Sequence, residues 1–311
     1  MDVKHKTIQE QGYEVFINIY LPEKPPKAIV QINHGVAEHS NRYNDFAEFL
    51  CNKGYAVYTH DHPAHGKSLK PDSQTGHLPW RGGWDLMLNV IHSINKTIRK
   101  KHPQVPVFIL GHSMGSLLTR YYNATYPMYF KGMILSGTTE PNPVTLKSAL
   151  LFTRLNRFFK KQEYSNKLLN DAFFKGFNRS IPDPKTNFDW LSTNPAEVEK
   201  YITDPLCGFP LSLGFLKNLF QGSLQMLKAE KNLRFRKNFS TLIISGKDDP
   251  VGNFGKHPKI VEQKYIQQGF YRTRINLLDG RHELLNETDE IKTKTYMIIE
   301  NFIESKLLGN F

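Results

Sequence analysis

The chain has 311 residues, of which 39% are hydrophobic and 23% charged, a composition that is typical of globular proteins and excludes a disordered chain. Lys and Arg outnumber Asp and Glu by 41 to 29, and the formal net charge of +12 favours contact with anionic surfaces. The basic residues are spread along the chain without a helix-turn-helix, zinc-finger or RNA-binding motif, so we expect no nucleic-acid partner.

The chain shows no secretion or membrane-spanning signal. No apolar segment precedes the first polar stretch, and no apolar run is long enough to span a bilayer. We therefore expect a cytoplasmic protein whose contact with a membrane, if any, is peripheral. The two cysteines, Cys51 and Cys207, match no zinc or redox spacing and are expected to be reduced and packed.

Short apolar runs of strand length alternate with longer segments of helical period along the first half of the chain. This alternation predicts an α/β fold with a mostly parallel sheet and helices on both faces. Strands are expected at residues 13–21, 28–33, 55–60, 107–110 and 133–136, and helices at 43–53, 84–101 and 114–126.

The alternation of strand-like and helix-like segments stops after residue 136, where long stretches rich in Phe and Lys show little strand character and contain several prolines. This change predicts an inserted helical cap at 140–236 between two parts of the core, 1–139 and 237–311. In the second part, strands are expected at 241–245 and 274–278, and helices at 256–268 and 289–306.

Residues 111–115 have the sequence Gly-His-Ser-Met-Gly, a G-x-S-x-G motif between a predicted strand and a predicted helix. This setting is that of the nucleophile elbow of an α/β-hydrolase. Glycines are needed at both ends because side chains there would collide in the strained turn. We therefore predict Ser113 as the nucleophile.

A serine nucleophile needs a histidine base, and the base needs an acid that orients it. In this fold the acid and then the histidine follow the serine in the chain, each at the carboxyl end of a strand. Asp249, immediately before Pro250, follows the strand 241–245, and His282 follows the strand 274–278. We predict the triad Ser113, Asp249 and His282. The alternatives are Asp248 or Asp279 for the acid and His257 for the base.

Attack on a carbonyl builds negative charge on oxygen, which preorganised backbone N–H groups stabilise. Met114 follows the nucleophile and is one predicted donor. The loop after the strand 28–33 carries the pair His34-Gly35, which is typical of oxyanion loops in lipases and esterases. Val36 is therefore the second predicted donor.

A metal site is the alternative chemistry. His60, His62 and His65 have the spacing H-x-H-x-x-H, and imidazoles at such a spacing can share a zinc ion. In zinc hydrolases of the metallo-β-lactamase type an Asp precedes the last histidine, where this chain has Ala64. We therefore favour a packed strand-to-turn corner and expect no metal or other cofactor.

Six segments of the chain, spread from the oxyanion loop to the histidine loop, together resemble the monoacylglycerol lipase and lysophospholipase group of α/β-hydrolase serine hydrolases. That group's HGxGEHxxRY and DHxGHGxS patterns have alanines at two of their glycines here, Ala37 and Ala64. The resemblance implies hydrolysis of the single acyl ester of a monoacylglycerol or a lysophospholipid. A general carboxylesterase or thioesterase of the same fold is the alternative. The matching segments are NHGVAEHSNRY, DHPAHGKS, GHSMGS, NPAEVEKYITDPLCG, GKDDPVG and GRHELLNE.

The predicted cap carries features that suit a lipid ester. Ten of the 21 phenylalanines lie between residues 141 and 220, where a channel for an acyl chain would use them. Residues 144–162 combine Leu and Phe at helical spacing with Lys and Arg, which is the pattern of a basic amphipathic helix. Two interpretations stay open: this helix contacts a membrane surface, or it packs on the core.

Overall fold

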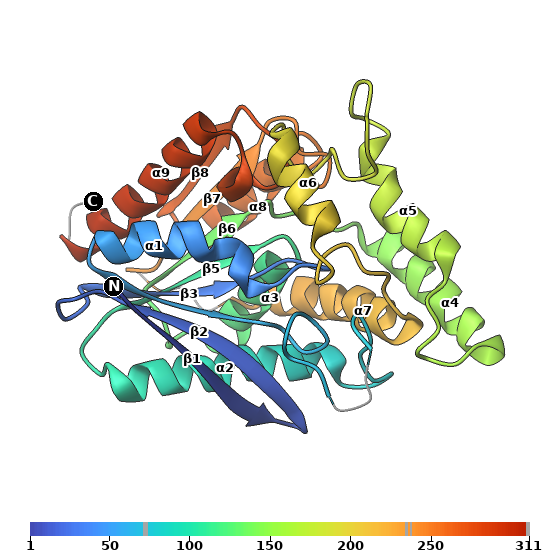
Figure 1. The fold of residues 1–311 in the computed structure, drawn as a ribbon, viewed down its shortest axis with the longest axis horizontal. Coiled ribbons are helices and arrows are strands. Elements are labelled where there is room, and N and C mark those ends of the chain that lie inside the picture. Colours follow the sequence, from blue (N-terminus) through green and yellow to red (C-terminus); the bar gives the residue numbers. More distant parts are fainter. Residues whose placement is uncertain (71–73, 234–235, 237, 309–311) are drawn as a thin grey trace.

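The computed structural model describes residues 1–70, 74–233, 236 and 238–308. Its sheet has eight strands in the order β1-β2-β4-β3-β5-β6-β7-β8 (Figure 1). The pairs β1–β2 and β2–β4 are antiparallel, and all other neighbours in the sheet are parallel. The strands are β1 (Asp2–Glu10), β2 (Tyr13–Leu21), β3 (Ala28–Asn33), β4 (Tyr55–His60), β5 (Val107–His112), β6 (Gly132–Ser136), β7 (Ser240–Gly246) and β8 (Thr273–Leu278).

Helices cover both faces of this sheet (Figure 1). Alternate residues of β3 enter different apolar clusters: Ile29 packs with residues of α2 and α3, while Val30 and Ile32 pack with residues of α1 and α9. This two-sided burial confirms the predicted fold class. The helices are α1 (Asn44–Asn52), α2 (Gly83–Lys101), α3 (Met114–Thr125), α8 (Lys256–Gln267) and α9 (Asp289–Leu307), with short 3₁₀ helices η1 (Ser40–Tyr43) and η2 (Leu284–Asn286).

The central strands are buried along their whole length, which explains why their sequences are continuous apolar runs. The edge strand β1 differs, because most of its residues are exposed and polar residues occupy both of its faces. This strand was not predicted, since an edge strand without an apolar face carries no alternation signal.

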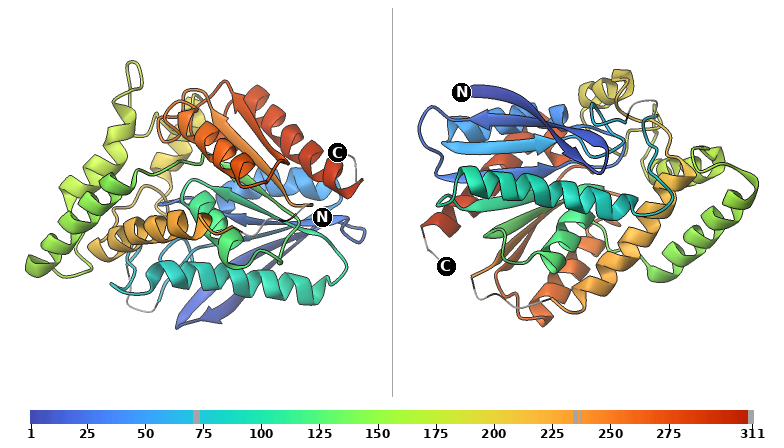
Figure 2. Two further views of the ribbon diagram at one scale, coloured as in Figure 1. Left: turned by 180° about the vertical axis from the view of Figure 1, so that it is seen from behind. Right: turned by 90° about the horizontal axis from the view of Figure 1, so that it is seen from below.

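Residues 140–236 contain the helices α4 (Pro143–Phe159), α5 (Lys167–Asn178), α6 (Pro195–Thr203) and α7 (Leu213–Glu230). Helix α7 packs against α2 and α3 of the core and also against α4, and α4 and α5 lie at one end of the molecule (Figure 2). A polar side chain accepts a hydrogen bond from a first-turn N–H of each helix, which explains where the helices begin. These capping residues are Asn142, Asn166, Asn194 and Ser212.

No helix among the described residues combines the length and hydropathy required to cross a bilayer. Cys51 and Cys207 are both buried free thiols, as expected. Because β3 to β8 run parallel, the loops after their carboxyl ends meet at one edge of the sheet. All predicted site residues lie in these loops or at the helix that follows β5.

Candidate active site

Ser113 forms a sharp turn between β5 and α3. Its backbone has φ 51° and ψ −118°, a conformation that is rare for a residue with a side chain. A Cβ atom on Gly111 would lie 2.3 Å from the carbonyl oxygen of Gly115, and one on Gly115 would lie 2.1 Å from that of Asn33. Both glycines of the motif are therefore required by close backbone contacts.

The structure pairs His282 with Asp249. His282 Nδ1 lies 3.0 Å from Asp249 Oδ1, and both side chains are buried. Asp249 Oδ1 also accepts a hydrogen bond from the N–H of Val251 at 2.9 Å. The alternatives lie elsewhere: Asp248 is exposed, Asp279 forms an ion pair with Lys247 at the surface, and His257 Nδ1 lies 2.8 Å from the hydroxyl of Thr139.

His112, the residue before Ser113, packs against His282. Its ring lies 4.7 Å from the ring of His282, measured between centroids. A Cβ atom on Gly35 would lie 3.2 Å from both His112 Cδ2 and Ser113 Cβ. His282 Nε2 is buried and has no hydrogen-bond partner among the residues that the structure describes. A serine nucleophile in this fold would transfer its proton to this nitrogen.

The charges around His282 set its protonation. Burial by itself lowers the pKa of His282, but the charge of Asp249 and the hydrogen bond to it outweigh burial and raise this pKa above the ordinary value. Burial raises the pKa of Asp249, yet the contacts with His282 and two backbone N–H groups lower it overall. Burial and the neighbouring His282 lower the pKa of His112 to about 3, so His112 is neutral.

The two predicted oxyanion donors come from different segments of the chain. Met114 is the first residue of α3, and Val36 follows Gly35 in the loop after β3. Ala37 and Ala64, which replace glycines of the resembled pattern, have φ values of 55° and 67°. Both alanines thus occupy the left-handed conformation that glycine adopts more readily.

The loop 34–40, which we call the oxyanion loop, is held by residues 201–208, which we call the clamp segment. The carbonyl of Ala37 accepts hydrogen bonds from the Tyr201 hydroxyl and from the N–H of Gly208, each at 2.9 Å. His39 Nε2 lies 2.8 Å from Asp204 Oδ2. These contacts fix the backbone immediately after Val36.

A buried ion network was missed by the sequence analysis. Arg42 makes a bidentate pair with Glu283, with N–O distances of 2.5 and 2.6 Å, and a further contact with Glu38 at 3.3 Å. Glu38 also accepts a hydrogen bond from the N–H of Gly35. The network therefore joins the oxyanion loop to the residue that follows His282. The sequence carries a signal for part of this network. Glu38 and Arg42 are four positions apart in the segment NHGVAEHSNRY, which is the spacing of ion pairs on a helix.

The three histidines of the zinc alternative do not gather their ring nitrogens at one point among the described residues. His60 Nε2 lies 3.1 Å from His62 Nδ1, and His62 Nε2 lies 3.2 Å from the carbonyl oxygen of His34. Burial lowers the pKa of His60 to about 3 and that of His65 to about 4. These side chains form a buried, packed corner.

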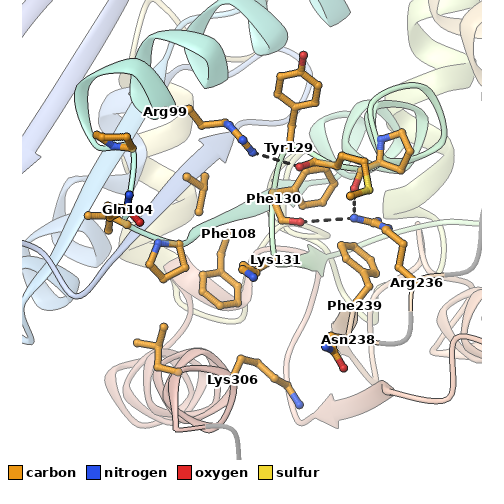
Figure 3. A pocket seen from close by; sticks show the side chains of 17 residues that line it. Arg99, Gln104, Phe108, Tyr129, Phe130, Lys131, Arg236, Asn238, Phe239 and Lys306 are labelled. Atoms are coloured by element: carbon orange, nitrogen blue, oxygen red, sulfur yellow. Dashed lines mark hydrogen bonds between the residues drawn. The ribbon is translucent and has the colours of Figure 1, made fainter.

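A cavity of about 750 Å³ lies at the amino ends of β5, β6 and β7, the opposite end of the sheet from Ser113 (Figure 3). Both lining arginines donate hydrogen bonds to backbone carbonyls: Arg99 to that of Met128, and Arg236 to that of Phe130. Because this cavity lies at the amino ends of the strands, it is not part of the candidate active site.

Comparisons with known proteins identify the family of this chain. A family model described as serine aminopeptidase S33 matches residues 24–289. A monoglyceride lipase homolog of monkeypox virus is 27% identical over 94% of this chain and 95% of its own length. Rat monoglyceride lipase is 30% identical over 66% of this chain and 60% of its own length.

Among solved structures, a thermostable carboxyl esterase from Bacillus coagulans in complex with glycerol has a TM-score of 0.87 and 25% identity, with 99% of each chain covered. This similarity extends over the core and over residues 140–236 alike. The chain therefore belongs to the serine aminopeptidase S33 family, in the group of α/β-hydrolases that includes the monoacylglycerol lipases.

Proposed function

We propose that this enzyme hydrolyses the single acyl ester of a monoacylglycerol, with Ser113, His282 and Asp249 as its catalytic triad. The observation that carries the proposal is the buried His282–Asp249 pair beside a serine in a strained strand-to-helix turn. The names of the relatives support an acylglycerol, because the viral and rat proteins are both described as monoglyceride lipases or their homologs.

The proposed reaction passes through an acyl-enzyme. His282 Nε2 accepts the proton of Ser113 Oγ while this oxygen attacks the ester carbonyl carbon. The N–H groups of Val36 and Met114 donate to the oxyanion, and each such donor contributes about 3 kcal/mol to the stability of the transition state. His282 then protonates the departing glycerol oxygen. A water molecule, deprotonated by His282, attacks the acyl-enzyme, and His282 returns the proton to Ser113 Oγ as the fatty acid leaves.

The charge state of His282 predicts the pH dependence. His282 must be neutral to accept a proton, and its pKa is raised above the ordinary value by Asp249. The acidic limb of kcat/KM is therefore expected at a pH above about 6.5, the ordinary histidine value. Activity is lost below this limb as His282 becomes protonated. Initial rates across pH, measured with a neutral ester, check this, and a limb at or below the ordinary value would contradict it.

The clamp segment predicts a positioning role for Tyr201. In Tyr201→Phe the carbonyl of Ala37 loses one of its two hydrogen bonds. We expect kcat to fall by about fivefold with little change in KM, because one hydrogen bond contributes about 1 kcal/mol. The control is Tyr164→Phe, which changes a cap tyrosine that is exposed. Equal kcat values for wild type and Tyr201→Phe would show that the clamp does not set the oxyanion loop.

We further propose that residues 140–236 act as a cap that receives the acyl chain and delivers it from a membrane surface. On α4 only Leu150 and Thr153 are buried, while Phe158 and Phe159 are 81% and 85% exposed. Exposed basic residues lie among these apolar side chains: Lys147, Arg154, Arg157, Lys160 and Lys161. An apolar surface framed by cations fits an anionic lipid interface.

Replacing both phenylalanines, Phe158→Ser with Phe159→Ser, is expected to weaken binding to vesicles of phosphatidylcholine and phosphatidylserine by at least about tenfold, since two exposed aromatic side chains no longer enter the interface. Co-sedimentation with the vesicles measures this binding. Tyr271→Ser is the matched control, because Tyr271 is 76% exposed outside the cap. Equal losses in both variants, or none in the first, would contradict the proposed contact.

A substrate panel tests the proposed function. The enzyme should release fatty acid from long-chain monoacylglycerols faster than from diacylglycerols, lysophosphatidylcholine, acyl thioesters and short-chain esters at equal concentrations. A preference for lysophosphatidylcholine would redirect the proposal to a lysophospholipase, and a preference for short-chain esters or thioesters would replace it with a general esterase or thioesterase. Kinetics with each substrate dispersed in the same detergent separate these outcomes.

A further inference from the structure

A cluster of three potential metal ligands lies where the oxyanion loop meets the clamp segment. His39 comes from the oxyanion loop, and Asp204 and Cys207 come from the clamp segment. One ligand atom of each residue, an imidazole nitrogen, a carboxylate oxygen and the thiol sulfur, lies within 4.8 Å of the other two. No step of the proposed reaction uses these three side chains.

The chemistry of this set matches one kind of ion. Imidazole, carboxylate and thiolate are the ligands that zinc prefers, and a site with three protein ligands leaves a fourth position for water. His39 and Cys207 are buried, whereas the side chain of Asp204 is 30% exposed and gives access from solvent. A hard ion such as Mg²⁺ would instead require an octahedron of oxygens.

The ligands are held in place before any ion binds. The Asp204 Oδ1 atom accepts a hydrogen bond from the N–H of Leu206 at 2.8 Å, which orients Oδ2 toward His39. The N–H of Cys207 donates to the carbonyl of Asp204 at 3.0 Å. Since Ala37 is also tied to both ends of the clamp segment, the two chain segments meet in a fixed arrangement. Such outer contacts raise the affinity of a metal site.

The local charge also favours a cation. Cys207 interacts electrostatically with the guanidinium of Arg42. Arg42 is itself paired with two carboxylates, Glu38 and Glu283, which offset its positive charge. The carboxylate of Asp204 is then the main charge that a zinc ion would meet between His39 and Cys207.

We propose that His39 Nε2, Asp204 Oδ2 and Cys207 Sγ bind one Zn²⁺ ion, with water as the fourth ligand. The thiol proton of Cys207 passes to solvent when the Zn–S bond forms, and no electron is transferred. The ion ties the oxyanion loop to the clamp segment. Because it binds the folded chain, it raises the melting temperature, and this rise grows with the logarithm of the zinc concentration above the dissociation constant.

Calorimetric titration of Zn²⁺ into the full chain, free of any histidine tag and of residual metal, tests this site. We expect one equivalent of Zn²⁺ to bind and to raise the melting temperature. Cys207→Ser and Asp204→Asn should each weaken binding by at least about tenfold, the least that even an outer contact contributes. Melting temperatures in the presence of a chelator show that both variants fold.

Two controls separate this site from other thiols and from the triad. Cys51→Ser removes the other buried free thiol, and His282→Gln removes the triad imidazole. Both variants should bind Zn²⁺ as the wild type does. Binding that is absent in the wild type, unchanged in Cys207→Ser and Asp204→Asn, or lost in His282→Gln would overturn the proposal. Zinc binding is measured without catalysis, so a negative result here would not contradict the proposed function, and the reverse also holds.

Discussion

In the Ser113→Ala variant, kcat for monoacylglycerol hydrolysis is expected to fall by about 10⁴- to 10⁶-fold, the range seen when a triad nucleophile is removed. The variant lacks the oxygen that forms the acyl-enzyme, so only the binding site and the oxyanion donors remain. The fold should be unaffected, because alanine meets the same backbone conformation at φ 51° that serine tolerates. Steady-state fatty-acid release and thermal unfolding measure the two effects.

A serine away from the site provides the matched control. Ser93 lies on α2, donates to Glu10 at 2.7 Å, and belongs to none of the loops that carry the predicted site residues. Ser93→Ala should keep the wild-type kcat. Retention of activity within about tenfold in Ser113→Ala would exclude an acyl-enzyme on this residue, since residual catalysis without a nucleophile is orders of magnitude weaker.

The Asp249→Asn variant is expected to lose about 10⁴-fold in kcat, as when a triad acid is changed to its amide. The neutral amide can present its N–H group to His282 Nδ1 instead of accepting a hydrogen bond from it, so it favours the wrong tautomer and no longer stabilises the imidazolium. The loss of charge also removes the interaction that raises the pKa of His282. Rates at saturating substrate, with the melting temperature as a check on folding, measure this.

The neighbouring acid is the control within the same loop. Asp248 precedes Asp249 in the chain but is exposed, whereas Asp249 is buried against His282. Asp248→Asn should therefore act at the wild-type rate. The reverse result, with activity lost in Asp248→Asn and kept in Asp249→Asn, would assign the acid to the other aspartate and show that the loop rearranges.

The order of strands and helices could be predicted because the buried parallel strands have unbroken apolar sequences and sit between amphipathic helices. Strand β1 could not, since its exposed polar residues resemble a loop. The elbow could also be predicted. Backbone contacts require glycine at positions 111 and 115, so the turn is visible as a short local motif in the sequence.

Contacts between distant segments left a weaker trace. Arg42 and Glu283 lie 241 positions apart, and nothing in either segment alone shows that they form a pair. The adjacent acids Asp248 and Asp249 both follow β7, so only the direction of their side chains distinguishes them. His39 illustrates the same limit, because its partners in the clamp segment follow more than a hundred residues later.

Labelling with a fluorophosphonate probe, followed by mass spectrometry of the digested protein, tests the identity of the nucleophile most directly. The probe forms a stable bond with a serine that is activated by a histidine and flanked by oxyanion donors. We expect one equivalent of adduct, located on Ser113, and no adduct in Ser113→Ala or after unfolding. An unlabelled wild type, or an adduct on any other residue, would contradict the proposed triad.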